Sequence, residues 1–211
     1  MTIIAAGKVK EGDKTVVYAA SDGQFTRAGE ALRVKDCCKI VRFPRFVAMF
    51  TGIASVHHIL QEMARDEQFL LEECCKMETP LHALAFTRVV CSELGDRLSD
   101  APEKSWADMI IATPTSIYVT DSYQYIHEVD DFTAQGSGGP YTLGYFEGVY
   151  EDIKTEEDLH GMMMKGLKVA CAIDTGCGGE LFCIKVSPEN LPDEPKPPKK
   201  RKSSRKKKSD S

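Results

Sequence analysis

The chain has 211 residues, of which 42% are hydrophobic and 28% are charged, in the ordinary range for a soluble globular protein. A chain of this length can bury one good-sized core or at most two small ones. No apolar run approaches the ~18 residues that indicate a membrane span. Charged residues from Lys8 onward interrupt the N-terminus too early for the apolar region of a signal peptide. We therefore expect a cytoplasmic protein that is neither secreted nor bound to a membrane.

Charge is divided unevenly between the two ends of the chain. Residues 188–211 hold nine of the 27 lysines and arginines and four of the 32 aspartates and glutamates, so this part carries +5. Residues 1–187 hold the other 18 basic and 28 acidic residues and carry −10. An acidic body with a basic tail does not fit a basic nucleic-acid-binding domain.

The cysteines favour neither a disulfide framework nor a metal site. The chain has eight: Cys37, Cys38, Cys74, Cys75, Cys91, Cys171, Cys177 and Cys183. Several stand as adjacent pairs, which matches neither a disulfide pattern nor the C-x-x-C spacing of a zinc site. We expect reduced, mostly buried thiols in an intracellular protein, with no metal and no cofactor.

Strand patterns dominate the first 50 residues. Four runs have this character: residues 3–6, 15–20, 39–43 and 46–50. The polar residues 10–14 between the first two runs predict a hairpin. Pro44 and Arg45 predict a second tight connection between the last two runs.

Helical spacing follows in the middle of the chain. Apolar residues recur at three- and four-residue intervals through 56–70 and again through 84–94, which predicts two helices. Thr79 and Pro80 between them indicate that one helix stops and another starts. Strands return in three further runs, at residues 108–113, 116–120 and 125–129.

The last third predicts two more helices and a closing strand region. The helices are expected at about 141–152 and 155–171, the second opening with Thr155 and Asp158 in the Thr-x-x-Asp form of a helix N-terminus. Ile173 and residues 180–186 are expected to be extended. The expected order along the chain is strands, two helices, strands, two helices and strands. This order is typical of an α+β protein whose helices cover the outer faces of packed sheets.

We expect residues 1–187 to form one domain and residues 188–211 to form a Pro-rich linker and a disordered basic tail. The tail has two interpretations. It is typical of a nuclear import signal or of an electrostatic arm for an anionic partner. It is equally typical of a solvated, solubilising extension.

Several short motifs stand in a fixed order along the chain: Met-Thr-Ile-Ile-Ala-Ala at 1–6, Ser-Asp-Gly-Gln at 21–24, Lys39, Gly-Ser-Gly-Gly-Pro-Tyr at 136–141 and Asp-Thr-Gly-Cys-Gly-Gly at 174–179. Over about residues 2–186 their order resembles the proteasome β-type family of N-terminal-nucleophile hydrolases. The bacterial ATP-dependent two-ring protease subunit carries a similar early Asp-Gly-Gln and late Gly-Ser-Gly-Gly-Pro-Tyr. The resemblance implies a four-layer αββα sandwich.

The resemblance also implies a chemistry. A threonine at a free N-terminus can act as nucleophile while its own α-amino group accepts the hydroxyl proton. Thr2 is small enough for Met1 to be removed ahead of it. A neighbouring lysine favours the neutral amine and the developing alkoxide, and Asp22 would hold that lysine charged. Lys39 stands 17 residues after Asp22, close to the family's interval, which favours it over Lys35.

Further roles follow from the resemblance alone. Ser137 and Asp174 would support the terminal amine, and Cys177 stands where the family usually has serine. Backbone N–H groups near Thr51 and Gly52 would form the oxyanion hole.

Three local features allow more than one interpretation. Met49 would form the floor of a hydrophobic side-chain pocket or would simply pack in the core. The glycine-rich loop at 136–140 could hold an anion at a helix start, but it lacks the Gly-Lys-Ser/Thr ending of a P-loop. The adjacent His57 and His58 have no partner at helical spacing, so packing or solvation is preferred to metal binding.

The function expected from the resemblance is that of a threonine-type endopeptidase subunit in a closed stack of rings. It would cleave peptides or unfolded proteins and depend on a separate ATP-driven unfoldase. A second hypothesis is a catalytically silent structural subunit, because Met1 best fits the nucleophile's place in the family's first strand and Thr2 the second. A one-residue slip turns every strand side chain to the other face. A third is an amidase acting on small amides, against which Thr2 and Lys39 argue.

Overall fold

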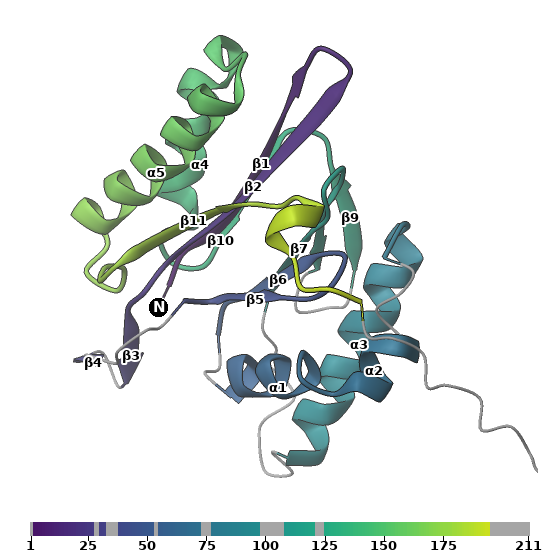
Figure 1. The fold of residues 1–211 in the computed structure, drawn as a ribbon. Helices are drawn as coiled ribbons and strands as arrows, with labels where there is room; N and C mark the ends of the chain where they lie inside the picture. Colours follow the sequence, from purple (N-terminus) through teal and green to yellow (C-terminus); the bar gives the residue numbers. More distant parts are fainter. Residues whose placement is uncertain are drawn as a thin grey trace, which may run out of the picture.

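The computed structural model describes residues 2–27, 30–32, 38–52, 55–72, 77–97, 108–120 and 125–194. Two antiparallel sheets lie face to face, and helices cover the outer side of each (Figure 1). This arrangement confirms the predicted α+β class and the four-layer αββα sandwich.

The first sheet has the strand order β10-β1-β2-β11. Its strands are β1 (Ile4–Glu11), β2 (Lys14–Asp22), β10 (Phe132–Gln135) and β11 (Leu181–Lys185). The predicted hairpin is confirmed, since Glu11 pairs with Lys14 across a two-residue turn. Gly12 takes a φ of 62° in that turn, a conformation that costs glycine little.

The second sheet has the order β5-β6-β7-β8-β9. Its strands are β5 (Ile40–Arg42), β6 (Val47–Phe50), β7 (Met109–Ala112), β8 (Ile117–Thr120) and β9 (Ile126–Val129). All five lie in predicted strand runs. A separate two-stranded ribbon, β3 (Phe25–Arg27) and β4 (Glu30–Leu32), follows β2 and was not predicted.

Five α-helices form the outer layers among the described residues. They are α1 (Ser55–Met63), α2 (Glu67–Glu72), α3 (Pro80–Arg97), α4 (Gly139–Val149) and α5 (Glu156–Ile173), with short 3-10 turns η2 (Tyr150–Asp152) and η3 (Pro188–Asn190). Thr79 accepts a hydrogen bond from the His82 N–H as α3 begins, and Thr155 forms a capping box with Asp158. Both predicted helix starts are therefore confirmed.

Side chains of β1 alternate between the two faces of the sheet, so this one strand contributes to two hydrophobic clusters. Ile4 and Ala6 face the second sheet and belong to the cluster between the sheets. Ile3 and Ala5 face the other way and pack with residues of α4 and α5. A third cluster joins the second sheet to α1, α2 and α3. Because successive strand side chains point to opposite faces, three apolar layers separate the four structural layers.

Three predictions for the elements need correction. Ile173 is the last residue of α5 and is 54% exposed, so it is not a strand residue. The helix predicted through 56–70 breaks at 64–66, where the Asp66 carboxylate caps α2 by accepting from the N–H of Gln68. The strand β10 was missed because it is four residues long and runs directly into the glycine-rich turn.

The packed region reaches beyond residue 187. Leu191 is buried with the inter-sheet cluster, and Arg45 donates a 2.6 Å hydrogen bond to Glu194. The basic residues from 196 onward lie outside the described part of the chain, so the predicted disorder of that tail stays a prediction.

Candidate active site

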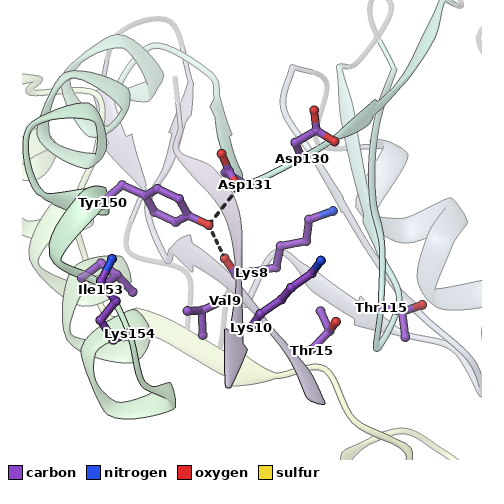
Figure 2. A pocket seen from close by; sticks show the side chains of 10 residues that line it. All are labelled: Lys8, Val9, Lys10, Thr15, Thr115, Asp130, Asp131, Tyr150, Ile153 and Lys154. Carbon is purple, nitrogen blue, oxygen red and sulfur yellow. Dashed lines mark hydrogen bonds between the residues drawn. The ribbon is translucent and has the colours of Figure 1, made fainter. Parts of the chain in front are cut away.

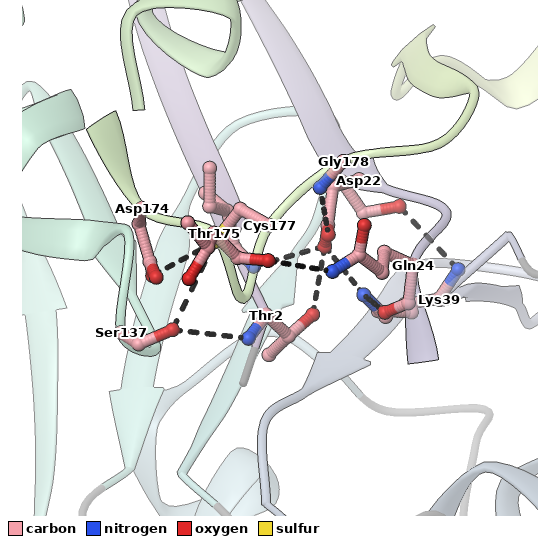
Figure 3. A network of polar contacts seen from close by, with 11 residues as sticks. Thr2, Asp22, Gln24, Lys39, Ser137, Asp174, Thr175, Cys177 and Gly178 are labelled. Carbon is pink, nitrogen blue, oxygen red and sulfur yellow. Dashed lines mark hydrogen bonds and ion pairs between the residues drawn. The ribbon is translucent and has the colours of Figure 1, made fainter. Parts of the chain in front are cut away.

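The predicted catalytic residues come together at one end of the first sheet (Figure 3). They arrive from five places in the chain: Thr2 before β1, Asp22 at the end of β2, Lys39 before β5, Ser137 after β10 and Asp174 at the end of α5. Antiparallel pairing produces this meeting, since Asp22 ends β2 where β1 begins and β10 ends beside the same point.

Asp22 occupies the centre of the network and has no exposed surface. Its Oδ1 accepts from the Thr2 hydroxyl at 2.8 Å, from the Ile3 N–H at 2.9 Å and from the Lys39 ammonium. Its Oδ2 accepts from the Gly178 N–H at 3.0 Å. A buried carboxylate is tolerated only when its oxygens are paired in this way.

Lys39 is buried against this carboxylate, with only 2% of its side chain exposed. Its ammonium also donates to the Gln24 carbonyl oxygen at 2.8 Å and lies 5.4 Å from the centroid of the Phe25 ring. The lysine is therefore a fixed positive charge beside the Thr2 hydroxyl and not a solvated surface residue.

Thr2 presents its two functional atoms to different partners. Its backbone nitrogen donates to Ser137 Oγ at 3.3 Å, while its hydroxyl reaches Asp22. The Gly138 N–H donates to the Thr2 carbonyl at 3.4 Å, which fixes the backbone at this point. Met1 lies outside the described residues.

A second polar group supports Ser137. Asp174 Oδ1 accepts from the Gly176 N–H at 2.8 Å and Oδ2 accepts from the Cys177 thiol at 3.1 Å. The hydrogen bond from the Ser137 hydroxyl, followed by those from Gly176 and Cys177, holds the Asp174 pKa below its usual value. Asp174 is therefore an ionised acceptor at neutral pH.

Cys177 acts in this group as a neutral donor. Burial, and then its hydrogen bond to Asp174, raises the pKa of the thiol to about 12. Its sulfur lies 3.8 Å from Ser137 Oγ. Because the thiolate is the nucleophilic form of cysteine, the geometry makes Cys177 a hydrogen-bonding group and not a nucleophile.

Close packing explains the glycines of the 136–139 turn. Gly136 has a φ of 93°, and a Cβ placed there would lie 2.2 Å from the Thr2 carbonyl oxygen. A Cβ on Gly138 would lie 2.3 Å from Ile3 Cγ1 and 2.8 Å from Cys177 Sγ. The turn can approach the start of β1 only where side chains are absent.

Two residues of the network had no predicted role. The Gln24 amide donates to the Thr175 carbonyl at 3.0 Å, so Gln24 joins the end of β2 to the 174–179 loop as well as binding Lys39. Gly178 contributes the N–H that binds Asp22. Both stand inside motifs that the sequence singled out, but their type alone did not indicate these contacts.

The three residues predicted to contact the substrate lie in different surroundings. Met49 has no exposed surface and packs between the sheets, which matches its core-packing interpretation. The Thr51 N–H already donates to the Asp108 carbonyl at 2.9 Å, so it is engaged. Gly52 is exposed, with a φ of 103°, and its N–H is the candidate oxyanion donor that remains.

A cavity of about 530 Å³ lies at the far end of the first sheet and contains none of the predicted site residues (Figure 2). Charges of both signs line it, including Lys8, Lys10 and Asp130. The Tyr150 hydroxyl donates at 2.7 Å to the Lys8 carbonyl and lies 3.1 Å from Asp131 Oδ1. These hydrogen bonds connect the end of α4 to β1 and to the start of β10. The hydrogen-bonded polar groups at this cavity therefore have a structural role.

No helix in the described part of the chain is long and apolar enough to cross a membrane.

Two packed sheets between two helical layers, with Thr2 ahead of the first strand in a network with Asp22 and Lys39, define the class of N-terminal-nucleophile hydrolase folds. The family described as Proteasome subunit matches residues 11–185, and the chain belongs to that family.

Relatives agree with this family, and solved structures agree with the fold. "Proteasome subunit beta 2" of Aeropyrum pernix is 27% identical over 193 residues, which cover 86% of this chain and 84% of that protein. "Proteasome subunit beta" of Nanoarchaeum equitans is 27% identical over 202 residues, covering 87% and 93%. The structure of Thiobacillus denitrificans BPH superposes with a TM-score of 0.71 at 22% identity, covering 89% of this chain and all of that one. The same protein in complex with Epoxomicin gives a TM-score of 0.66 at 19% identity. At these identities the structural likeness shows the fold.

Proposed function

We propose that this chain is a threonine-type endopeptidase subunit whose nucleophile is Thr2, exposed by removal of Met1. One observation carries the proposal: the nitrogen of Thr2 binds Ser137 while its hydroxyl binds Asp22 beside Lys39. A single residue thereby has in contact with polar partners both the hydroxyl that this chemistry needs and the nitrogen that removal of Met1 would convert to a free amine.

In this proposal the Thr2 hydroxyl oxygen attacks the carbonyl carbon of the scissile peptide bond and its proton passes to the free α-amine. The Lys39 charge stabilises the alkoxide as it develops, and the Gly52 N–H donates to the carbonyl oxygen as it becomes an oxyanion. The C–N bond then breaks, and the α-ammonium returns the proton to the leaving amine. Water, deprotonated by the same α-amine, attacks the ester that remains. The bond between the acyl carbon and the Thr2 oxygen breaks, the α-ammonium returns its proton to that oxygen, and the acid is released.

The silent-subunit hypothesis places Met1 at the nucleophile's position. In that frame the Ser137 hydroxyl would serve the amine of Met1. The observed hydrogen bond reaches the nitrogen of Thr2 instead, which favours the catalytic frame. The buried Asp22 and Lys39 pair also favours it, because a silent subunit has no chemical need for a buried charge at this place.

We propose further that the chain associates with itself into stacked rings and receives unfolded protein from a separate ATP-dependent unfoldase. Its relatives carry the name of proteasome subunits, which supports the ring assembly. The basic tail would bind an anionic partner outside the folded domain. Light scattering of the purified chain measures the assembly directly.

The test is the intact mass of the purified protein before and after an epoxyketone inhibitor, whose warhead reacts with both the hydroxyl and the free amine of one N-terminal residue. We expect Met1 to be absent and one inhibitor to be bound, and we expect the Thr2→Ala variant to assemble normally and bind none. Retention of Met1 with no adduct would identify the silent subunit.

A further inference from the structure

The cavity at the far end of the first sheet lies along an open edge of β1 (Figure 2). Its lining residues come from both faces of that strand. Val9 and Ile153 lie on the side of α4 and α5, whereas Lys10 and Thr115 lie on the side of the second sheet. A single cavity reaches both faces of a strand only where no neighbouring strand covers its edge. The cavity is therefore a groove along the edge of β1, and we call it the edge groove.

The register of the sheet shows which main-chain groups lie at this edge. β10 pairs with β1 only as far as Gly7, so the last part of β1 pairs only with β2. The Lys8 N–H still donates to the Asp131 carbonyl at 2.8 Å, and the Lys8 carbonyl accepts from the Tyr150 hydroxyl at 2.7 Å. Main-chain groups of alternate residues point to the same edge of a strand. The N–H and C=O of Lys10 therefore also point into the edge groove, beyond the reach of β10.

Two lysine side chains project beside this edge. Lys8 and Lys10 continue the face of β1 that carries Ile4 and Ala6, and Figure 2 shows both directed to the same side of the strand. Neither ammonium forms an ion pair or a hydrogen bond with another residue in the described part of the chain. The Thr15 hydroxyl lies on the same face, directly across from Lys10 in β2. The edge groove therefore presents cationic groups that are available to an anionic ligand.

The charges and the free main-chain groups together define the occupant. Three lysines and two aspartates line the edge groove, so it is positive although residues 1–187 as a whole carry −10. A second copy of β1 would place lysine against lysine, and the basic tail of the chain is repelled for the same reason. A strand with an acidic residue opposite Lys10 pairs favourably. Its next side chain points to the other face, where an apolar residue fits beside Val9 and Ile153.

We infer that the edge groove binds an extended segment of another polypeptide, in which acidic and apolar residues alternate and which adds to β1 as an antiparallel strand at Lys10. The site is separate from the catalytic network, because Lys10 follows Thr2 by eight residues, about 27 Å along an extended strand. A segment bound there holds its protein on the subunit without occupying the catalytic site. The inference therefore does not depend on the proposed peptidase activity.

The probe is a fluorescein-labelled peptide, Val-Glu-Val-Glu-Val with blocked ends, and fluorescence anisotropy measures its binding to the full chain carrying Thr2→Ala, which cannot cleave it. We expect saturable binding that weakens as NaCl is raised, because salt screens exposed charges. Lys10→Glu should weaken this binding about tenfold, since it replaces an attractive cross-strand pair by a repulsive one. The same variant should improve the binding of Val-Lys-Val-Lys-Val. Lys168→Glu makes the same charge change on an exposed position of α5 outside the edge groove and is the matched control.

Methyl groups on the peptide nitrogens test the strand addition itself. In an antiparallel pair the residue opposite Lys10 exchanges two hydrogen bonds with it, while the N–H groups of its neighbours point away. Methylation of both glutamate nitrogens should therefore weaken binding about tenfold, the size of one lost hydrogen bond. Methylation of the valine nitrogens should leave it nearly unchanged.

The outcomes separate this inference from the proposed function. Absence of saturable binding, or an equal effect of Lys10→Glu and Lys168→Glu, overturns the edge groove and leaves the peptidase standing, because the epoxyketone adduct is measured independently at Thr2. Equal effects of the two methylations overturn the strand addition. Binding that meets these expectations in a chain that forms no adduct supports the edge groove and overturns the peptidase alone.

Discussion

Asp22 and Lys39 form an ion pair in which 0% and 2% of the two side chains are exposed. The pair is completed by the Thr2 hydroxyl and by the Gly178 N–H, both on Asp22. A pair this deeply buried contributes little net stability as a unit, because desolvation offsets the attraction, but removing one partner leaves an uncompensated charge in the core.

We therefore expect Asp22→Asn to lower the free energy of unfolding by about 3–5 kcal/mol and to abolish inhibitor binding, since it leaves the Lys39 ammonium buried without a counter-charge. Urea unfolding measures the first effect and intact mass the second. The double variant Asp22→Asn, Lys39→Met should recover most of the stability and none of the reactivity. If the double variant is no more stable than the single one, the charges do not interact as described.

Gly138 is a position where the site has no room for a side chain. A Cβ there would lie 2.3 Å from Ile3 Cγ1, and Ile3 has no exposed surface and follows Thr2 directly. We expect Gly138→Ala to lower the free energy of unfolding by about 1–3 kcal/mol, the usual cost of overpacking, and to slow adduct formation because Thr2 must move with Ile3.

Gly144 in the middle of α4 provides the control, since nothing lies within 4 Å of a Cβ built there and the residue is exposed. Gly144→Ala should raise the stability by up to about 1 kcal/mol through its higher helix propensity. Equal effects of the two substitutions on unfolding and on reactivity would contradict the packing argument for Gly138.

Much of this arrangement could be predicted from the sequence, because strong local signals coincide with the family's motif order. The hairpin around Gly12 and the capping box of Thr155 each depend on residues close together in the chain. The meeting of Thr2, Asp22 and Ser137 needed the resemblance, since 20 and 135 residues separate Thr2 from its two partners.

What could not be predicted depends on tertiary contacts between short or ambiguous segments. The four residues of β10 carry too little periodicity to compete with the glycine motif that follows them. The Thr51 N–H is engaged only because the chain at Asp108 passes beside it, 57 residues later. The role of Gln24 likewise exists only once distant segments have packed.

The described cysteines predict a pH dependence of stability. Burial raises the pKa of Cys177 and Cys183 from the ordinary 9.0 to about 12. The folded state therefore retains protons that the unfolded state loses above about pH 9, so stability is full below that pH and falls as the pH rises toward 12. We expect the urea midpoint to decrease steadily above pH 9, and less steeply in the double variant Cys177→Ser, Cys183→Ser.

The same pKa values predict that both thiols resist alkylation. At pH 8 iodoacetamide should modify Cys177 and Cys183 slowly in the folded protein and rapidly in urea, because only the thiolate reacts. Peptide mapping by mass spectrometry identifies each site. Rapid labelling of Cys177 in the folded protein would contradict its role as a buried, neutral donor to Asp174.

The position of the domain boundary can be tested by truncation. Leu191 is 8% exposed and packs with the inter-sheet cluster, four residues beyond the predicted boundary at 187. A chain ending at 194 should unfold at the same urea concentration as the full chain. A chain ending at 187 should lose about 1.5–3 kcal/mol, the value of one buried leucine side chain. The Arg45 and Glu194 pair contributes little to this loss, because its side chains are 40% and 50% exposed.

Two single variants separate these contributions in the full chain. Leu191→Ala should cost about 1.5–3 kcal/mol, as much as the truncation at 187, because it removes the same buried side chain, whereas Glu194→Gln should cost less than about 1 kcal/mol. If the chain ending at 187 is as stable as the full chain, residues 188–194 are an accessory segment and the boundary predicted from composition is the right one. If Glu194→Gln costs as much as Leu191→Ala, the ion pair and not the leucine holds this segment on the domain.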